Sequence, residues 1–214
     1  MLAIPAFGLA VLSPHIAEAQ GSLYLSSLGL TPSGSSSVGN DSWLAADFVT
    51  GSNAGGYLLN SVQLGLAYAS GNPNGFKTML YTEVGAAAPF PGTSLGTLDG
   101  SLNPAIGGIY IYSPDSDLAL SPNTAYFIVL TAGTAVANGA YGWSFTSTYA
   151  PTLSGGWHGD AAFLSSSDGL NWHFNSAYAQ FGISATDVPE PSMLGLLALG
   201  GLLLVWLRQK AKAL

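Results

Sequence analysis

Ala125-Tyr126-Phe127-Ile128-Val129-Leu130-Thr131 is the stretch that decides the fold. Five consecutive apolar residues, 126–130, stand at its centre. Successive side chains of a strand point to opposite faces, so this run is apolar on both faces. Such a pattern is typical of a strand that is buried on both sides, and it predicts a central strand of a sheet.

Outward from this run, the chain between Gln20 and Asp187 is a series of short strand-like runs separated by Gly, Pro, Asn and Asp. No part of it has a sustained helical period. The pattern predicts an all-β fold, an antiparallel β-sandwich of jelly-roll type. Residues 33–39, rich in Ser and Gly, are expected to form a solvated loop. The predicted strands cover residues 43–50, 58–68, 76–83, 94–98, 108–113, 125–131, 142–149, 161–165 and 177–185.

One of these runs, residues 58–68, alternates as a half-buried strand does. The polar side is expected to carry Ser61, Gln63 and Gly65. The apolar side is expected to consist of Leu58, Val62, Leu64, Leu66 and Tyr68.

Composition restricts the possible partners of this segment. Residues 20–187 contain one Lys, no Arg and nine acidic residues, a formal net charge of −8. That charge disfavours nucleic acid and anionic lipid as partners. Cys is absent, so neither a disulfide nor a thiolate metal site is available. The length is that of a single domain with a packed core.

The last part of the chain, residues 188–214, differs from the rest. A 15-residue apolar block, 193–207, would form a helix about 22 Å long, shorter than the ~30 Å hydrocarbon core of a bilayer. It is predicted to be a marginal transmembrane helix, with basic side chains that hold the tail in the cytoplasm. These basic residues are Arg208, Lys210 and Lys212. Before the block stand Val188, Pro189, Glu190 and Pro191.

This order of parts resembles the PEP-CTERM sorting signal of Gram-negative bacteria that carry exosortases. Pro189, Glu190 and Pro191 match the Pro-Glu-Pro of that family, and the apolar helix and basic stop follow. The resemblance implies that a membrane protease, the exosortase, recognises the tail. It also implies an exported protein, first anchored in the inner membrane and then located at the cell surface or in the extracellular matrix.

An export signal is expected at the front, in residues 1–19. Residues 2–12 are mostly apolar, and Ala17 and Ala19 before Gln20 fit a signal cleavage site. No Lys or Arg precedes Lys77, so the positive start of a signal peptide is missing. We expect a start upstream of Met1, with cleavage that leaves Gln20 as the first residue.

Residues 20–187 also resemble the choice-of-anchor R domain of exported proteins. The resemblance implies a β-sandwich outside the cell and no known activity. Short turn and core patterns carry it, and these are Leu28-Gly29, residues 44–51, residues 59–64, residues 120–126, and Ser167-Asp168-Gly169 with Trp172.

The sequence gives weak support for a catalytic or metal-binding site. His158 with Asp160, and His173, could serve as bases, but no nucleophile elbow accompanies them. A glycosidase pair could be drawn from Glu83, Asp99, Asp115, Asp117, Asp160 and Asp168. Asp115 and Asp117 lack the spacing of a calcium loop and favour a turn. Residues 167–172 resemble the Asp-box hairpin, one residue short. We therefore expect no catalytic residue, no metal and no cofactor.

Aromatic residues suggest a binding role. Tyr110 and Tyr112 share one face of a predicted strand, with Ile109 and Ile111 on the other, and Trp157 lies near a loop. Such rings can stack on the apolar faces of sugars. The sequence favours a non-catalytic module that binds extracellular polysaccharide through Tyr110, Tyr112 and Trp157. Two alternatives stay open, a structural glycosylated surface or biofilm component and, last, a glycan hydrolase.

Overall fold

The computed structural model describes residues 21–85, 87–159 and 162–189. The predicted signal peptide, Glu190, Pro191, the apolar block and the basic residues Arg208, Lys210 and Lys212 lie outside these ranges. The described residues form antiparallel strands, with one short 3-10 turn, η1 (Val136–Asn138). The strands are β1 (Ser22–Ser26), β2 (Gly34–Val38), β3 (Trp43–Val49), β4 (Tyr57–Gly71), β5 (Lys77–Val84), β6 (Phe90–Asp99), β7 (Gly108–Pro114), β8 (Ala119–Leu120), β9 (Ala125–Thr131), β10 (Gly139–Thr146), β11 (Thr152–Leu153), β12 (Phe163–Ser166), β13 (His173–Phe174), β14 (Tyr178–Ala179) and β15 (Phe181–Asp187).

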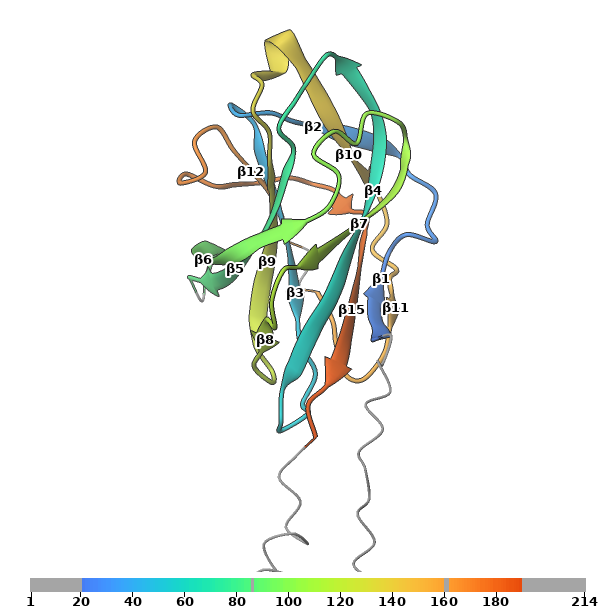
Figure 1. Cartoon of the computed structure of the whole chain (residues 1–214), viewed down its shortest axis with the longest axis vertical. Helices are drawn as coiled ribbons and strands as arrows, with labels where there is room; N and C mark the ends of the chain where they lie inside the picture. The colour runs from blue at the N-terminus through green and yellow to red at the C-terminus, as the bar shows by residue number, and fades with distance from the viewer. Residues whose placement is uncertain (1–20, 86, 160–161, 190–214) are drawn as a thin grey trace, which may run out of the picture.

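The strands join into one curled sheet, in the order β11-β1-β15-β4-β7-β6-β5-β9-β3-β12-β13. Figure 1 shows the two halves of this sheet, with β5 and β9 on one side and β4, β15 and β1 on the other. The link between the halves is short, because β6 pairs with β7 only at Leu98–Pro114 and Asp99–Ser113. The all-β antiparallel prediction is confirmed. The sheet folds back on itself to give two layers, and the jelly-roll form of the sandwich stays a prediction.

The main core lies between the two halves. Leu44 and Phe48 of β3 and Ile128 of β9 belong to the same buried cluster as Val62 and Leu64 of β4. The other face of β9 is buried too, because Phe127 and Val129 pack with Ala45, Met79 and Leu164 in a second cluster. The prediction of a central strand buried on both faces is therefore confirmed for residues 125–131.

The side chains of β4 do not alternate regularly between its two faces along the whole strand. Its pairing with β15 skips Asn60, because Ser61 faces Ser184 while Leu59 faces Ala185. This bulge places Leu59, rather than Leu58, on the core side, since each extra residue reverses the alternation of side chains.

The same effect recurs at the far end of β4. Its pairing with β10 passes from Ala67–Gly142 to Ser70–Ala140, so β4 again has one residue more than its partner. Tyr68 consequently points outward and is 76% exposed, whereas Ala69 packs against the core. The predicted inward positions of Leu58 and Tyr68 were wrong for this reason.

Residues 33–39 were expected to form a loop, and most of them form strand β2. Its residues pair with β10 from Gly34–Phe145 to Val38–Tyr141. The serines gave no alternating pattern because both faces of this edge strand are polar until Val38, which is fully buried. The strand exists because β10 supplies its hydrogen-bond partners.

Within the described ranges, no helix has the length and apolar character required to cross a membrane. The apolar block 193–207, to which the prediction of a transmembrane helix applies, lies outside those ranges.

Truncation of the central strand should be costly. Phe127 has no exposed surface, so Phe127→Ala leaves a cavity and should lower the free energy of unfolding by about 3–5 kcal/mol. Chemical denaturation of a chain comprising residues 20–189 measures this. Phe90→Ala is the matched control, because Phe90 is 41% exposed and its truncation should cost far less. Equal losses for the two variants would contradict the assignment of Phe127 to the core.

Candidate functional site

The residues expected to stack on sugars are mostly inside the fold. Tyr112 is 1% exposed, and burial raises the pKa of its phenol. Tyr110 is half-buried and donates a hydrogen bond to the carbonyl oxygen of Ile106. The pleat of β7 turns the tyrosines toward the core and leaves Ile109 and Ile111 outside. The expected binding face on β7 is therefore reversed.

Trp157 is also buried, in an aromatic cluster. Its ring stacks on Tyr24 at a centroid distance of 4.9 Å and on Phe48 at 5.8 Å, and Tyr57 meets it edge-on. Its indole nitrogen is enclosed, and no group in the described residues accepts a hydrogen bond from it. Trp157 closes one end of the core and presents no face to a ligand.

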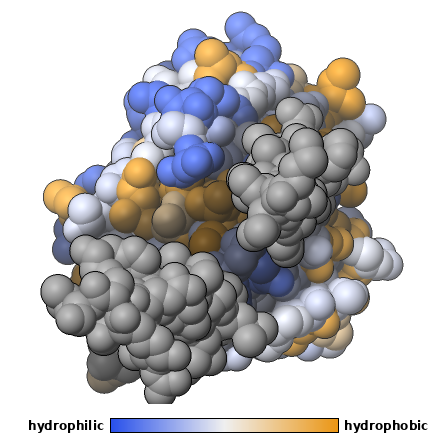
Figure 2. All heavy atoms as spheres, turned by 60° about the horizontal axis from the view of Figure 1, so that its bottom comes forward, coloured by the Kyte–Doolittle hydropathy of each residue, from blue (hydrophilic) through white to orange (hydrophobic). Residues whose placement is uncertain are grey.

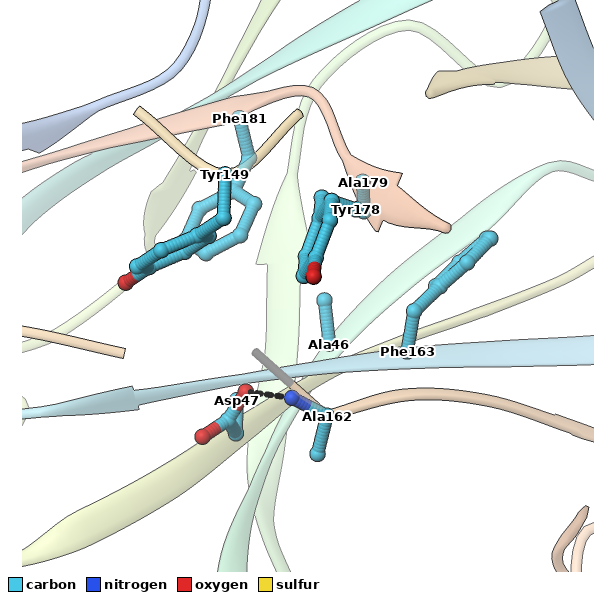
Figure 3. Close-up of a pocket in the computed structure, with 8 residues that line it drawn as sticks. All are labelled: Ala46, Asp47, Tyr149, Ala162, Phe163, Tyr178, Ala179 and Phe181. Carbon is cyan, nitrogen blue, oxygen red and sulfur yellow. Dashed lines mark hydrogen bonds between the residues drawn. The ribbon is translucent and has the colours of Figure 1, made fainter. Parts of the chain in front are cut away.

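Two other tyrosines flank a groove, which we call the tyrosine groove. Tyr149 and Tyr178 lie with ring centroids 5.3 Å apart and planes inclined at 47°. On one side of the pair is a cavity of about 20 Å³, shown in Figure 3, and its lining consists of Ala46, Asp47, Tyr149, Ala162, Phe163, Tyr178, Ala179 and Phe181. A second cavity of about 20 Å³ shares the two tyrosines, and Leu25, Leu30 and Pro151 also help to line it.

The second cavity continues into an open, polar depression. Leu30, Thr146 and Thr148 line both, and Thr31 and Ser147 complete the depression, whose volume is about 220 Å³. Each small cavity has room for about one water molecule. The groove thus combines an apolar floor and aromatic rings with hydroxyl groups at one end.

Strand pairing places the two tyrosines together. β14 pairs with the end of β10, so that Thr146 faces Tyr178. Tyr149 stands three residues after the end of β10. Its hydroxyl donates to the carbonyl oxygen of Gly159 at 2.8 Å and accepts the amide hydrogen of Gly159 at 2.9 Å. These bonds fix the ring, so the groove is formed before any ligand arrives.

Asp47 supplies the groove with a carboxylate. It is 3% exposed, and its Oδ1 accepts the amide hydrogen of Ala162 at 2.8 Å, the bond drawn in Figure 3. Because β3 turns Asp47 away from the main core, the carboxylate lies against the segment that precedes β12. Its hydrogen bond joins Ala162, the residue before β12, to the sheet.

Among the described residues, the other predicted polar groups do not assemble into a metal site. His158 and His173 are exposed, and Asp160 lies outside the described residues. Asp115 accepts a hydrogen bond from the hydroxyl of its neighbour Ser116. Among the residues that the structure describes, no three His, Asp or Glu side chains are grouped so that they could hold a metal ion.

Asp168 organises the turn between β12 and β13. Its Oδ1 accepts the amide hydrogens of Leu170 and Asn171 and the hydroxyl hydrogen of Ser166, while Oδ2 accepts from the Asn171 side chain. The amide of Asn171, followed by that of Leu170, lowers the pKa of this carboxyl strongly. Gly169 follows with φ of +73° against the Trp43 ring. The Asp168 turn is thus a structural hairpin element.

The tail leaves the fold where its last strand ends. β15 stops at Asp187, and Val188 is still hydrogen-bonded to the domain. Comparison with known families places a sorting signal at this point. Residues 187–209 match the PEP-CTERM protein-sorting motif.

The match confirms the sorting signal that the tail predicted, and it supports an exported protein whose membrane-anchored precursor is recognised by an exosortase. It covers the tail alone, so the resemblance of residues 20–187 to the choice-of-anchor R domain stays a prediction. Comparisons with curated proteins and with solved structures found no match.

Acid titration should reveal the role of Asp168. Because its folded-state pKa is depressed, its hydrogen bonds stabilise the turn above the unfolded-state value of about 3.9 and are lost as pH falls through the lower folded value. In NMR spectra the Asn171 amide signal should keep its position down to about pH 3.9 and move only below it. Asp168→Asn is the control, and its Asn171 signal should not titrate. A midpoint at the ordinary Asp value would refute this assignment.

Proposed function

We propose that the chain is an exosortase-sorted precursor that displays a non-catalytic module for extracellular polysaccharide, and that the tyrosine groove is its binding site. The observation that carries this proposal is the pair of fixed rings, Tyr149 and Tyr178, beside a hydroxyl-lined depression. Aromatic faces suit the apolar faces of sugar rings, and hydroxyl groups exchange hydrogen bonds with sugar hydroxyls.

The charge of the domain narrows the class of polysaccharide. With a formal net charge of −8 over residues 20–187 and a buried carboxylate at Asp47, an acidic polymer would be repelled. A neutral polysaccharide fits the domain better, because it carries no charge that the acidic surface would repel. The PEP-CTERM motif supports the location that this function requires, since it is a sorting signal of exported proteins.

A separate observation favours a second function, a structural component that carries glycans. β2 exposes Ser35 and Ser37 at a sheet edge, and Ser33 precedes them. Hydroxyl groups at an exposed edge are accessible to glycosyl transfer. The intact mass of the surface protein decides between the two, because attached glycans add mass to the polypeptide.

A hydrolase ranks third. Glycoside hydrolysis uses two carboxyl groups that flank the bond to be cleaved. Asp47 is the one carboxylate among the described residues that line the groove. The described lining therefore supplies one of the two carboxyl groups that this chemistry uses, and we assign the groove binding without catalysis.

Polysaccharide binding should depend on Tyr178. On a glycan array, a chain of residues 20–189 should bind neutral polysaccharides, and Tyr178→Ala should weaken binding at least about tenfold, equivalent to 1.4 kcal/mol. Tyr68→Ala is the matched control, because Tyr68 is 76% exposed on a different surface and should bind as the wild type does. Equal loss in both variants, or retention in Tyr178→Ala, would reject the groove.

Removal of the tail should depend on Pro189, Glu190 and Pro191. Proline holds the segment extended and accessible to a protease, so replacing all three with Ala should leave the full-length chain in the membrane. The mass of the protein from host cells with and without the exosortase measures the outcome. If the tail through Leu214 is retained equally in both, the segment is an ordinary anchor.

A further inference from the structure

The sorting motif begins inside the folded domain. Val188, the first residue after β15, donates its amide hydrogen to the carbonyl oxygen of Gly56 at 3.1 Å. The carbonyl oxygen of Val188 accepts a hydrogen bond from Nδ2 of Asn53, also at 3.1 Å. Both backbone groups of Val188 are therefore bonded to one turn, residues 53–57, which we call the Asn53 brace.

The brace is itself rigid. Nδ2 of Asn53 also donates to the Gly56 carbonyl oxygen at 2.6 Å, and the Gly56 amide donates to the Asn53 carbonyl oxygen at 2.8 Å. The Asn53 amide donates to the hydroxyl of Tyr57, which is 2% exposed. The turn fits closely against the tail, because a Cβ at Gly55 would overlap the carbonyl oxygen of Val188.

The strand before the brace is fastened on both sides. β15 pairs with β1 and with β4, and the hydroxyl of Tyr24 donates to Oδ1 of Asp187 at 2.8 Å. Ser22 pairs with Ala185, so the start of β1 and the last part of β15 lie at the same end of the molecule, the end turned forward in Figure 2. Chain that precedes Val188 can thus be freed only by opening the sheet.

We infer that the Asn53 brace controls how fast the sorting protease acts on the tail. Proteases bind their substrates as extended segments through backbone hydrogen bonds. The amide and carbonyl of Val188, next to Pro189, are unavailable for such bonds while the brace is closed. Opening the brace therefore precedes cleavage, and its hydrogen bonds slow the reaction. This inference rests on the proposed sorting of the chain by an exosortase.

The test is pulse-chase processing of the full-length chain in host cells. Asn53→Ala removes the bond to Val188 and should accelerate processing about fivefold, the factor that corresponds to roughly one net hydrogen bond. Asn72→Ala is the matched control, because Asn72 is an exposed asparagine at the other end of β4. It should be processed at the wild-type rate.

A second variant distinguishes an effect of the brace on processing from an effect of lower overall stability. A flexible Gly-Ser insertion between Val188 and Pro189 supplies extended chain outside the brace, so processing should be fast and Asn53→Ala should add nothing to it. If Asn53→Ala still accelerates processing in that background, a loss of overall stability is responsible and the brace is rejected.

The remaining outcomes are also decisive. If the wild type is processed and Asn53→Ala is processed at the same rate, the brace is rejected while sorting stands. If the wild type is processed equally with and without the exosortase, sorting by that protease is rejected, and the brace inference is rejected with it.

Discussion

Burial of β9 on both faces is the constraint on which the structure depends. Ile128 and Leu130 face the space between the halves of the sheet, and Phe127 and Val129 face the outer cluster. A strand with two apolar faces needs cover on both, so the sheet must curl over one face and loops must cover the other. The curl requires β6 to pass from β5 to β7.

The sequence predicted the strands whose signal lies in their own residues. The bounds of β9 agree with its apolar run, and those of β3 and β7 agree within one residue. It did not predict β2, whose serines form a strand because β10 pairs with them. It also assigned Leu58 and Tyr68, near the two ends of β4, to the wrong face of the strand. The bulges that reverse these positions depend on pairing with the neighbouring strands, and the alternation of apolar and polar residues does not reveal them.

The candidate site was hidden from the sequence for a related reason. Periodicity shows that Tyr110 and Tyr112 share a face, but it does not show which face of β7 is outside. Hydrophobicity would place the isoleucines of β7 in the core, but Ile109 and Ile111 are exposed. Tyr149 and Tyr178 meet through the pairing of β10 with β14, a contact between distant segments. The tail was predictable because a sorting signal acts as a linear motif that needs no fold around it.

The position of β15 has a mechanical consequence. This strand leads directly into the tail and lies between β1 and β4, with seven residues paired to β4 from Phe181–Leu64 to Asp187–Tyr57. A force applied through the tail runs along the strand, so the hydrogen bonds to both neighbours are loaded in shear and must fail together. A domain tethered through β15 therefore resists being pulled open.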